Sequence, residues 1–219
     1  MAVRHTAALF SAERYVAVLR ADYGLTDSLD LEKMKTDCAA RVPGLSTFGT
    51  ELLSVLRYDP EWFKENEDDP ELWGLIRLAE LARPAPSLSA SNDTGFYFLE
   101  QALSAIGWRK DETEHLQKGR SITELFQSPV NADAFPFPNM AYFLAGWLSA
   151  EDCKALRRDL LAAWNDEGSP PVAMVSRTEK FATQLNVDAA ETLRLVFRDA
   201  VAMLDASIAS GEALFLTLD

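Results

Sequence analysis

The chain has few of the residues on which many enzymes depend. Among 219 residues there are 2 cysteines, Cys38 and Cys153, 2 histidines, His5 and His115, and 10 glycines that form no cluster. Two cysteines cannot build a disulfide framework, and adding the two histidines does not give the ligand spacing of a usual zinc site. The scattered glycines give no phosphate-binding loop and no dinucleotide-binding fingerprint. The sequence therefore predicts no metal ligand, no cofactor and no catalytic residue.

Long hydrophobic runs are also missing. No stretch reaches the roughly 20 apolar residues of a transmembrane helix. The opening MAVRHTAALF holds too short an apolar stretch for the central region of a signal peptide. We therefore expect a soluble cytoplasmic protein with reduced thiols and no membrane partner.

Basic residues are outnumbered. The chain has 21 Lys and Arg against 34 Asp and Glu, a formal net charge of −13. Such a charge repels phosphate backbones and anionic membranes, so nucleic-acid binding is not expected. It favours a basic protein as partner, although solubility alone also explains many acidic proteins.

The acidic excess is concentrated in DPEWFKENEDDPE, residues 59–71, which holds seven acids and one lysine. Two interpretations stay open. DPEWF and DPELW repeat with a ten-residue offset, and each has a capping Asp, a first-turn Pro and a Glu that the helix dipole favours. The same acids, with neighbouring tryptophans as anchors, could instead bind a basic partner. The candidate partner-binding residues are Glu61, Trp62, Glu65, Glu67, Asp68, Asp69, Glu71 and Trp73.

The period of the apolar residues is mostly helical and predicts a helix-rich α+β fold, a single domain over residues 1–219 with a small sheet. Predicted helices cover 11–24, 27–40, 46–57, 94–106 and 111–118, with others starting at the two DPE motifs, after Ser149 and after Asp188. Predicted strands cover 3–10, 140–147 and 213–218, with a helix left open as the alternative for 140–147. Predicted loops cover 83–93, 128–139 and 165–171. The last strand, ALFLTL, is apolar enough to be buried on both faces.

The stretch LSAEDCKALRRDLLAAW, residues 148–164, decides how Cys153 is interpreted. With Ser149 as the N-cap, Asp152 can reach back to the Ser149 amide, and Leu148 packs on Cys153 in a hydrophobic staple. Cys153 then shares one helical stripe with Leu156, Leu160 and Trp164. The thiol is predicted to be a core residue rather than a nucleophile, and Cys38 is predicted to be a similar small apolar filler.

Three segments resemble the YfbM-like family of uncharacterised bacterial proteins. An N-terminal strand runs into SAERYVAVL, AGWLSAEDCKALRRDLLAAW combines a strand, a cap and an amphipathic helix, and FRDAVAMLDASIASGEALFLTL combines a long helix, a Gly turn and a buried strand. The resemblance implies a compact α+β fold and implies no catalytic residues.

Two main functional hypotheses follow, and a structural subunit of a larger assembly is a third. The first is a non-catalytic protein-binding module, such as an inhibitor of the immunity or antitoxin type, that binds a basic partner through residues 59–71. The alternative is an enzyme or small-ligand binder, of unknown reaction, that uses a carboxylate pair and aromatic residues in a pocket. The sequence does not decide the oligomeric state.

Overall fold

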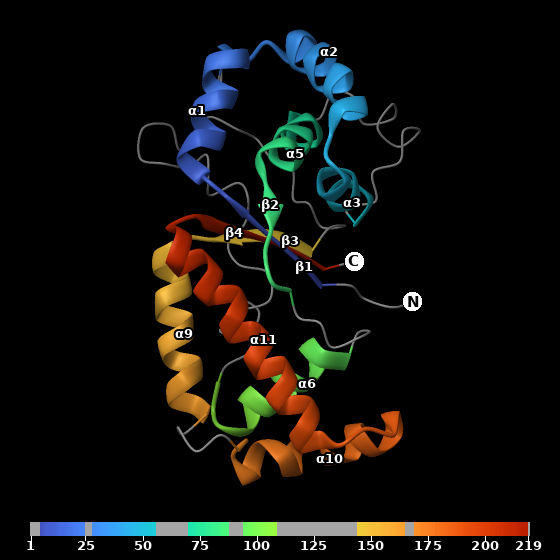
Figure 1. The fold of residues 1–219 in the computed structure, drawn as a ribbon, viewed down its shortest axis with the longest axis vertical. Helices are drawn as coiled ribbons and strands as arrows, with labels where there is room; N and C mark the ends of the chain where they lie inside the picture. Colours follow the sequence, from blue (N-terminus) through green and yellow to red (C-terminus); the bar gives the residue numbers. More distant parts are fainter. Residues whose placement is uncertain are drawn as a thin grey trace.

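The computed structural model describes residues 5–24, 28–55, 70–87, 94–108, 144–164 and 169–218. Four strands are β1 (His5–Phe10), β2 (Arg83–Pro84), β3 (Leu144–Leu148) and β4 (Ala213–Leu218). The helices are α1 (Ala12–Tyr23), α2 (Leu31–Arg41), the short 3-10 helix η2 (Val42–Gly44), α3 (Thr47–Val55), α5 (Pro70–Leu81), α6 (Thr94–Ala105), α9 (Ala150–Trp164), α10 (Val172–Leu185) and α11 (Ala189–Ser210). The predicted helix-rich α+β class is confirmed (Figure 1).

The four strands form one antiparallel sheet in the order β2-β1-β4-β3. β4 is central, with Leu216 opposite Ala7 of β1 and Gly146 of β3. Its residues 213–217 are all buried, which confirms the prediction of a C-terminal strand buried on both faces. Antiparallel sheets often leave one face to water, but here helices cover both faces.

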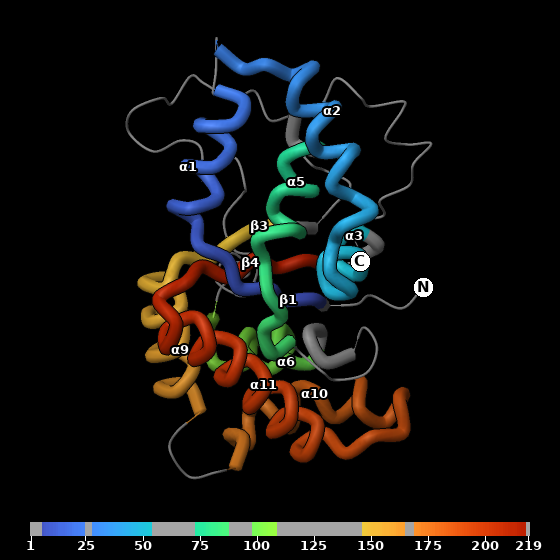
Figure 2. The backbone as a smooth tube through the Cα atoms, turned by 45° about the horizontal axis from the view of Figure 1, so that its top comes forward, coloured from blue at the N-terminus to red at the C-terminus, as the bar shows by residue number. Residues whose placement is uncertain are grey.

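Helices lie on both sides of the sheet, as Figures 1 and 2 show. We call α1, α2, α3 and α5 the first layer, and α6, α9, α10 and α11 the second layer. β4 supplies both cores in alternation: Ala213 and Phe215 belong to the first-layer core, while Leu214 and Leu216 belong to the second. One central strand therefore joins two separate apolar cores.

Three helix starts occur where the sequence predicts them, because each cap is made within four residues. The Ser11 side chain accepts from the Arg14 amide, and the Asp188 carboxylate accepts from the Glu191 amide at 2.7 Å. At the start of α9, Ser149 and Asp152 cap each other: the Ser149 amide donates to the Asp152 carboxylate at 2.9 Å, and the Asp152 amide donates to the Ser149 hydroxyl at 3.1 Å. These caps satisfy amides that would otherwise have no partner.

The predicted stripe of α9 is also confirmed. Cys153, Leu156, Leu160 and Trp164 are all buried, and all four belong to the second-layer core. The Trp164 ring stacks on Phe197 of α11, with ring centroids 4.0 Å apart and planes inclined by 19°. Leu148 is fully buried in the same core, as the staple requires.

The predicted start of the second helix is wrong. α2 begins at Leu31, and its cap is Asp30, whose carboxylate accepts from the Lys33 amide at 3.0 Å. Asp27, the first residue of the predicted range 27–40, lies outside the described residues. The Asp30 amide donates to the carbonyl of Tyr23 at 2.8 Å, which ties the start of α2 to the end of α1. With this contact in place, the helix begins later in the chain than the sequence predicts.

Neither β2 nor α10 was predicted. Arg83 and Pro84, placed in a loop by the sequence, form β2 at the sheet edge, where proline is tolerated because one side of the strand makes no ladder hydrogen bonds. The sequence also predicts nothing for residues 172–185, which form α10. This helix has no side-chain cap at Pro171 and ends at the left-handed Asn186, so the usual start signal is missing.

Candidate functional site

Most of the predicted partner-binding residues lie outside the described part of the chain. These are Glu61, Trp62, Glu65, Glu67, Asp68 and Asp69; Glu71 falls in the first turn of α5, but its side chain is not described. The helix start expected at DPELW is confirmed, because α5 begins at Pro70. Trp73 is 8% exposed and belongs to the first-layer core, so it contributes to packing within that layer. The predicted helix start at DPEWF and the predicted elements at 111–118 and 128–139 also lie outside the described residues.

α5 is the central helix of the first layer. Residues 73–79 are buried all around, and α1, α2 and α3 each pack against this helix. Two glycines allow the close approach: a Cβ on Gly49 would lie 2.7 Å from the Ala79 carbonyl oxygen, and one on Gly74 would lie 3.0 Å from the Tyr15 hydroxyl. The Tyr15 hydroxyl donates to the Gly74 carbonyl at 2.9 Å. The end of the acidic segment is therefore attached to a tightly held helix.

A charged cluster lies beside this core. Arg77 of α5 is 6% exposed and donates to Asp22 of α1 at 2.7 Å and to Glu80 of its own helix. Glu80 also accepts from Arg41 of α2 at 2.9 Å. We call Asp22, Arg41, Arg77 and Glu80 the Arg77 cluster. Because it joins α1, α2 and α5, it fixes these three helices relative to one another.

The sequence contains one signal for the Arg77 cluster. Arg77 is the single cation in ELWGLIRLAEL, a stretch of otherwise apolar residues and flanking acids. An arginine in the middle of a buried helix must be paired, because an isolated buried charge is costly. The stretch predicts a buried ion pair but cannot identify Asp22, which lies 55 residues away.

Both thiols are in the cores, as predicted. Cys38 and Cys153 are free and fully buried, one in each layer. Burial raises the pKa of each thiol to about 11, and Asp152 raises that of Cys153 further while Ser207 opposes it. The Cys38 sulfur lies 3.7 Å from the Tyr23 hydroxyl, whose pKa is also raised by burial. Since the thiolate is the reactive form, neither cysteine is suited to nucleophilic chemistry at neutral pH.

Among the described residues, the Arg77 cluster brings two carboxylates to one buried guanidinium, although the side chains of Asp22 and Glu80 are themselves 38% and 34% exposed. Asp22 and Glu80 are both bound by guanidinium groups there, which leaves neither as a free acid or base. Within the ranges that the structure describes, no three His, Cys, Asp or Glu residues gather so as to hold a metal ion. Nor does any helix in these ranges combine the length and apolarity needed to cross a membrane.

Comparisons with known proteins identify no relative. No family model, no curated protein and no solved structure matches this chain. The resemblance to the YfbM-like family therefore stays a prediction.

Proposed function

We propose that this protein is a non-catalytic binding module that recognises a basic protein through its acidic segment, residues 59–71. An inhibitor of the immunity or antitoxin type is the concrete version of this function. The observation that carries the proposal is the concentration of negative charge in that segment, seven acids and one lysine in thirteen residues. Opposite charges across an interface accelerate association and select the partner.

The distribution of charge over the chain supports the proposal. The described residues carry 14 of the 21 Lys and Arg but only 18 of the 34 Asp and Glu. The helices and strands are thus close to neutral, and most of the excess acid lies in the remaining segments. Solubility alone does not require the acids to be concentrated in so few residues, and helix starts at the two DPE motifs account for only some of them.

The attachment of the segment supports it as well. α3 ends at Val55 and α5 begins at Pro70, and these two helices pack against each other through Gly49. The Arg77 cluster then joins α5 to α1 and α2. Val55 and Pro70, the nearest described residues on either side of residues 56–69, therefore belong to helices of one layer. This limits how far apart the two helix ends can lie when a partner binds.

The test is to use the protein as bait at low ionic strength and to measure the affinity of the basic protein that it retains. Replacing Glu65, Glu67, Asp68 and Asp69 by their amides should weaken that affinity at least tenfold and flatten its dependence on salt. The affinity of the unaltered protein should fall steeply as salt is added.

A matched control removes the same charge from other helix starts. Glu13, Glu32, Glu151 and Glu191 each lie in the first turn of an α-helix and are exposed. Changing these four to glutamine should alter the affinity less than twofold. An equal loss of affinity in the two variants would mean that binding depends only on net charge. An unchanged affinity in the first variant would show that the acidic segment does not bind the partner.

A further inference from the structure

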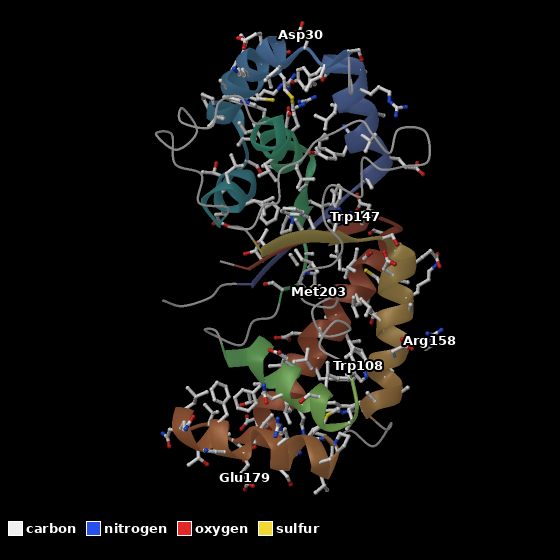
Figure 3. All side chains as sticks on the ribbon, turned by 180° about the vertical axis from the view of Figure 1, so that it is seen from behind. Asp30, Trp108, Trp147, Arg158, Glu179 and Met203 are labelled. Atoms are coloured by element: carbon white, nitrogen blue, oxygen red, sulfur yellow. The ribbon has the colours of Figure 1, made fainter. Side chains whose placement is uncertain are left out.

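α10 presents a face that no other described element covers. Its inner residues Met174, Thr178 and Ala182 are buried against the second layer, where α10 packs on α6 and α11. On the outside, Val172 is 81% exposed, and Val187, just beyond the helix, is 44% exposed. Figure 3 shows Glu179 on the side of α10 that points away from the sheet.

Five of the exposed residues of α10 form one stripe, and Ala173, Arg177, Gln184 and Leu185 are exposed outside it. At about 100° per residue, Val172, Ser176, Glu179, Lys180 and Thr183 fall within about 100° of one another around the helix. All five are exposed. Val187 follows the left-handed Asn186 that ends the helix, so it lies at the C-terminal end of the stripe.

The kinds of side chain along the stripe follow the same order from either end of the helix. Around a centre between Glu179 and Lys180, one step outward pairs Ser176 with Thr183, and the next pairs Val172 with Val187. Each pair is chemically matched: opposite charges at the centre, small hydroxyls next, and valines at the ends. A twofold axis brings residue i of one chain to residue j of the other and j to i, which is the relation these pairs have.

We propose that the outer face of α10 is the interface of a symmetric homodimer in which two α10 helices pack antiparallel. The twofold axis passes between Glu179 and Lys180. Each dimer then contains two pairs of Glu179 with Lys180 of the partner copy, flanked by two Ser176–Thr183 contacts and two Val172–Val187 contacts.

The physical chemistry of the face favours a second copy over another partner. Glu179 and Lys180 at the centre give the stripe no net charge. A partner with charges of one sign would therefore leave either Glu179 or Lys180 without an opposite charge. Ser176 and Thr183 are small, which lets two helix axes approach closely. Two antiparallel helices also oppose their dipoles favourably.

The dimer should be weak. One pair of 14-residue helices should bury less than the roughly 1,200 Å² of a standard interface, the range of weak and transient complexes. Sedimentation equilibrium of the full chain should show the 24.3 kDa monomer at low concentration and a growing dimer fraction as concentration approaches about 1 mM. A chain that remains monomeric throughout this range overturns the proposal.

Charge reversal tests the register. Lys180→Glu puts two Glu–Glu contacts at the axis and should weaken the dimer at least tenfold. The double variant E179K/K180E restores two opposite-charge pairs and should return to within about threefold of the original affinity. Arg177→Glu makes the same charge change on the same helix but away from the stripe, and should change the affinity less than threefold. If Lys180→Glu leaves the dimer affinity unchanged, the dimer interface is not the outer face of α10.

Cross-linking tests the symmetry. Chains carrying Ser176→Cys should form a disulfide with chains carrying Thr183→Cys when the two are mixed, and neither should link to itself. The native thiols are buried and do not compete. Self-linking of the Ser176→Cys chain would indicate a parallel pairing and would refute the arrangement. This test does not involve residues 59–71, so its outcome is independent of the proposed function.

Discussion

The two helical layers solve the burial of polar groups in different ways. In the first layer, Arg77 is buried and binds Asp22 and Glu80 across two helices. In the second layer, the buried polar side chains have partners close in sequence: the Thr178 and Ser207 hydroxyls donate to the carbonyls of Met174 and Glu212, and the Asp199 carboxylate accepts from Arg198. The Arg77 guanidinium instead combines Glu80 of its own helix with Asp22, which lies 55 residues away on α1.

The difference shows why the layers should respond differently to substitution. The first layer depends on contacts that fix the relative positions of three helices: the Arg77 cluster and the close approach at Gly49. The second layer depends on apolar packing between α9, α11, α6 and the sheet. We therefore expect the first layer to be sensitive to geometry and the second to lost apolar volume.

The largest effect is expected on β4, which both layers share. Phe215→Ala should lower the free energy of unfolding by about 4 kcal/mol and Leu216→Ala by about 3 kcal/mol, because each creates a cavity in one core. As the strand joins the cores, both layers should lose amide-exchange protection in either variant. Loss confined to one layer would contradict the expectation of a single domain.

Arg77→Ala should have the next largest effect. It removes the packing of a side chain that is 7% exposed together with its bonds to Asp22 and Glu80, of which Glu80 keeps Arg41. The free energy of unfolding, measured with denaturant, should fall by about 3 kcal/mol. The control is Arg157→Ala, whose pair with Asp205 in the second layer is much more exposed and should contribute less than about 1 kcal/mol. If both variants lose the same stability, burial of the Arg77 cluster is not what matters.

Gly49→Ala tests the close approach of α3 to α5. The new Cβ would lie 2.7 Å from the Ala79 carbonyl, so one helix must shift, at a cost of about 2 kcal/mol. Gly44→Ala is the control, since a Cβ there meets nothing within 4 Å. Thermal unfolding should separate the two variants, and equal melting temperatures would show that the first layer adjusts without strain.

The smallest expected effect concerns the two buried thiols, Cys38 and Cys153. Because burial raises the pKa of both to about 11 from an ordinary 9.0, the folded state keeps protons that the unfolded state loses. Their contribution to stability is complete below about pH 9 and is lost as the pH rises towards 11. At pH 8 neither thiol of the folded protein should react with a disulfide reagent, since the thiolate fraction is about a hundredfold below that of a free thiol.

The Arg77→Ala variant sharpens this comparison. Loosening the first layer should accelerate labelling of Cys38 by local opening and leave Cys153 nearly as slow as before. Equal acceleration at both thiols would mean that the layers open together.

Features that depend on neighbouring residues could be predicted from the sequence. The caps at Ser11, Ser149 and Asp188 each close within four residues, and the stripe of α9 follows from helical period alone. The both-sided burial of ALFLTL was predicted from its composition. The acidic segment could be recognised as a candidate site, but spacing cannot show what lies around it.

What the sequence determined by itself is therefore local: most helix starts, the apolar stripes, the buried strand and the concentration of charge. Tertiary structure decided which helices share a layer, which acid neutralises Arg77, and that Arg83 and Pro84 join the sheet rather than a loop. It also decided which face of α10 is left exposed. Local features follow from hydrogen bonds and periodicity within a few residues, whereas these choices join segments tens of residues apart and exist only once the sheet has brought the layers together.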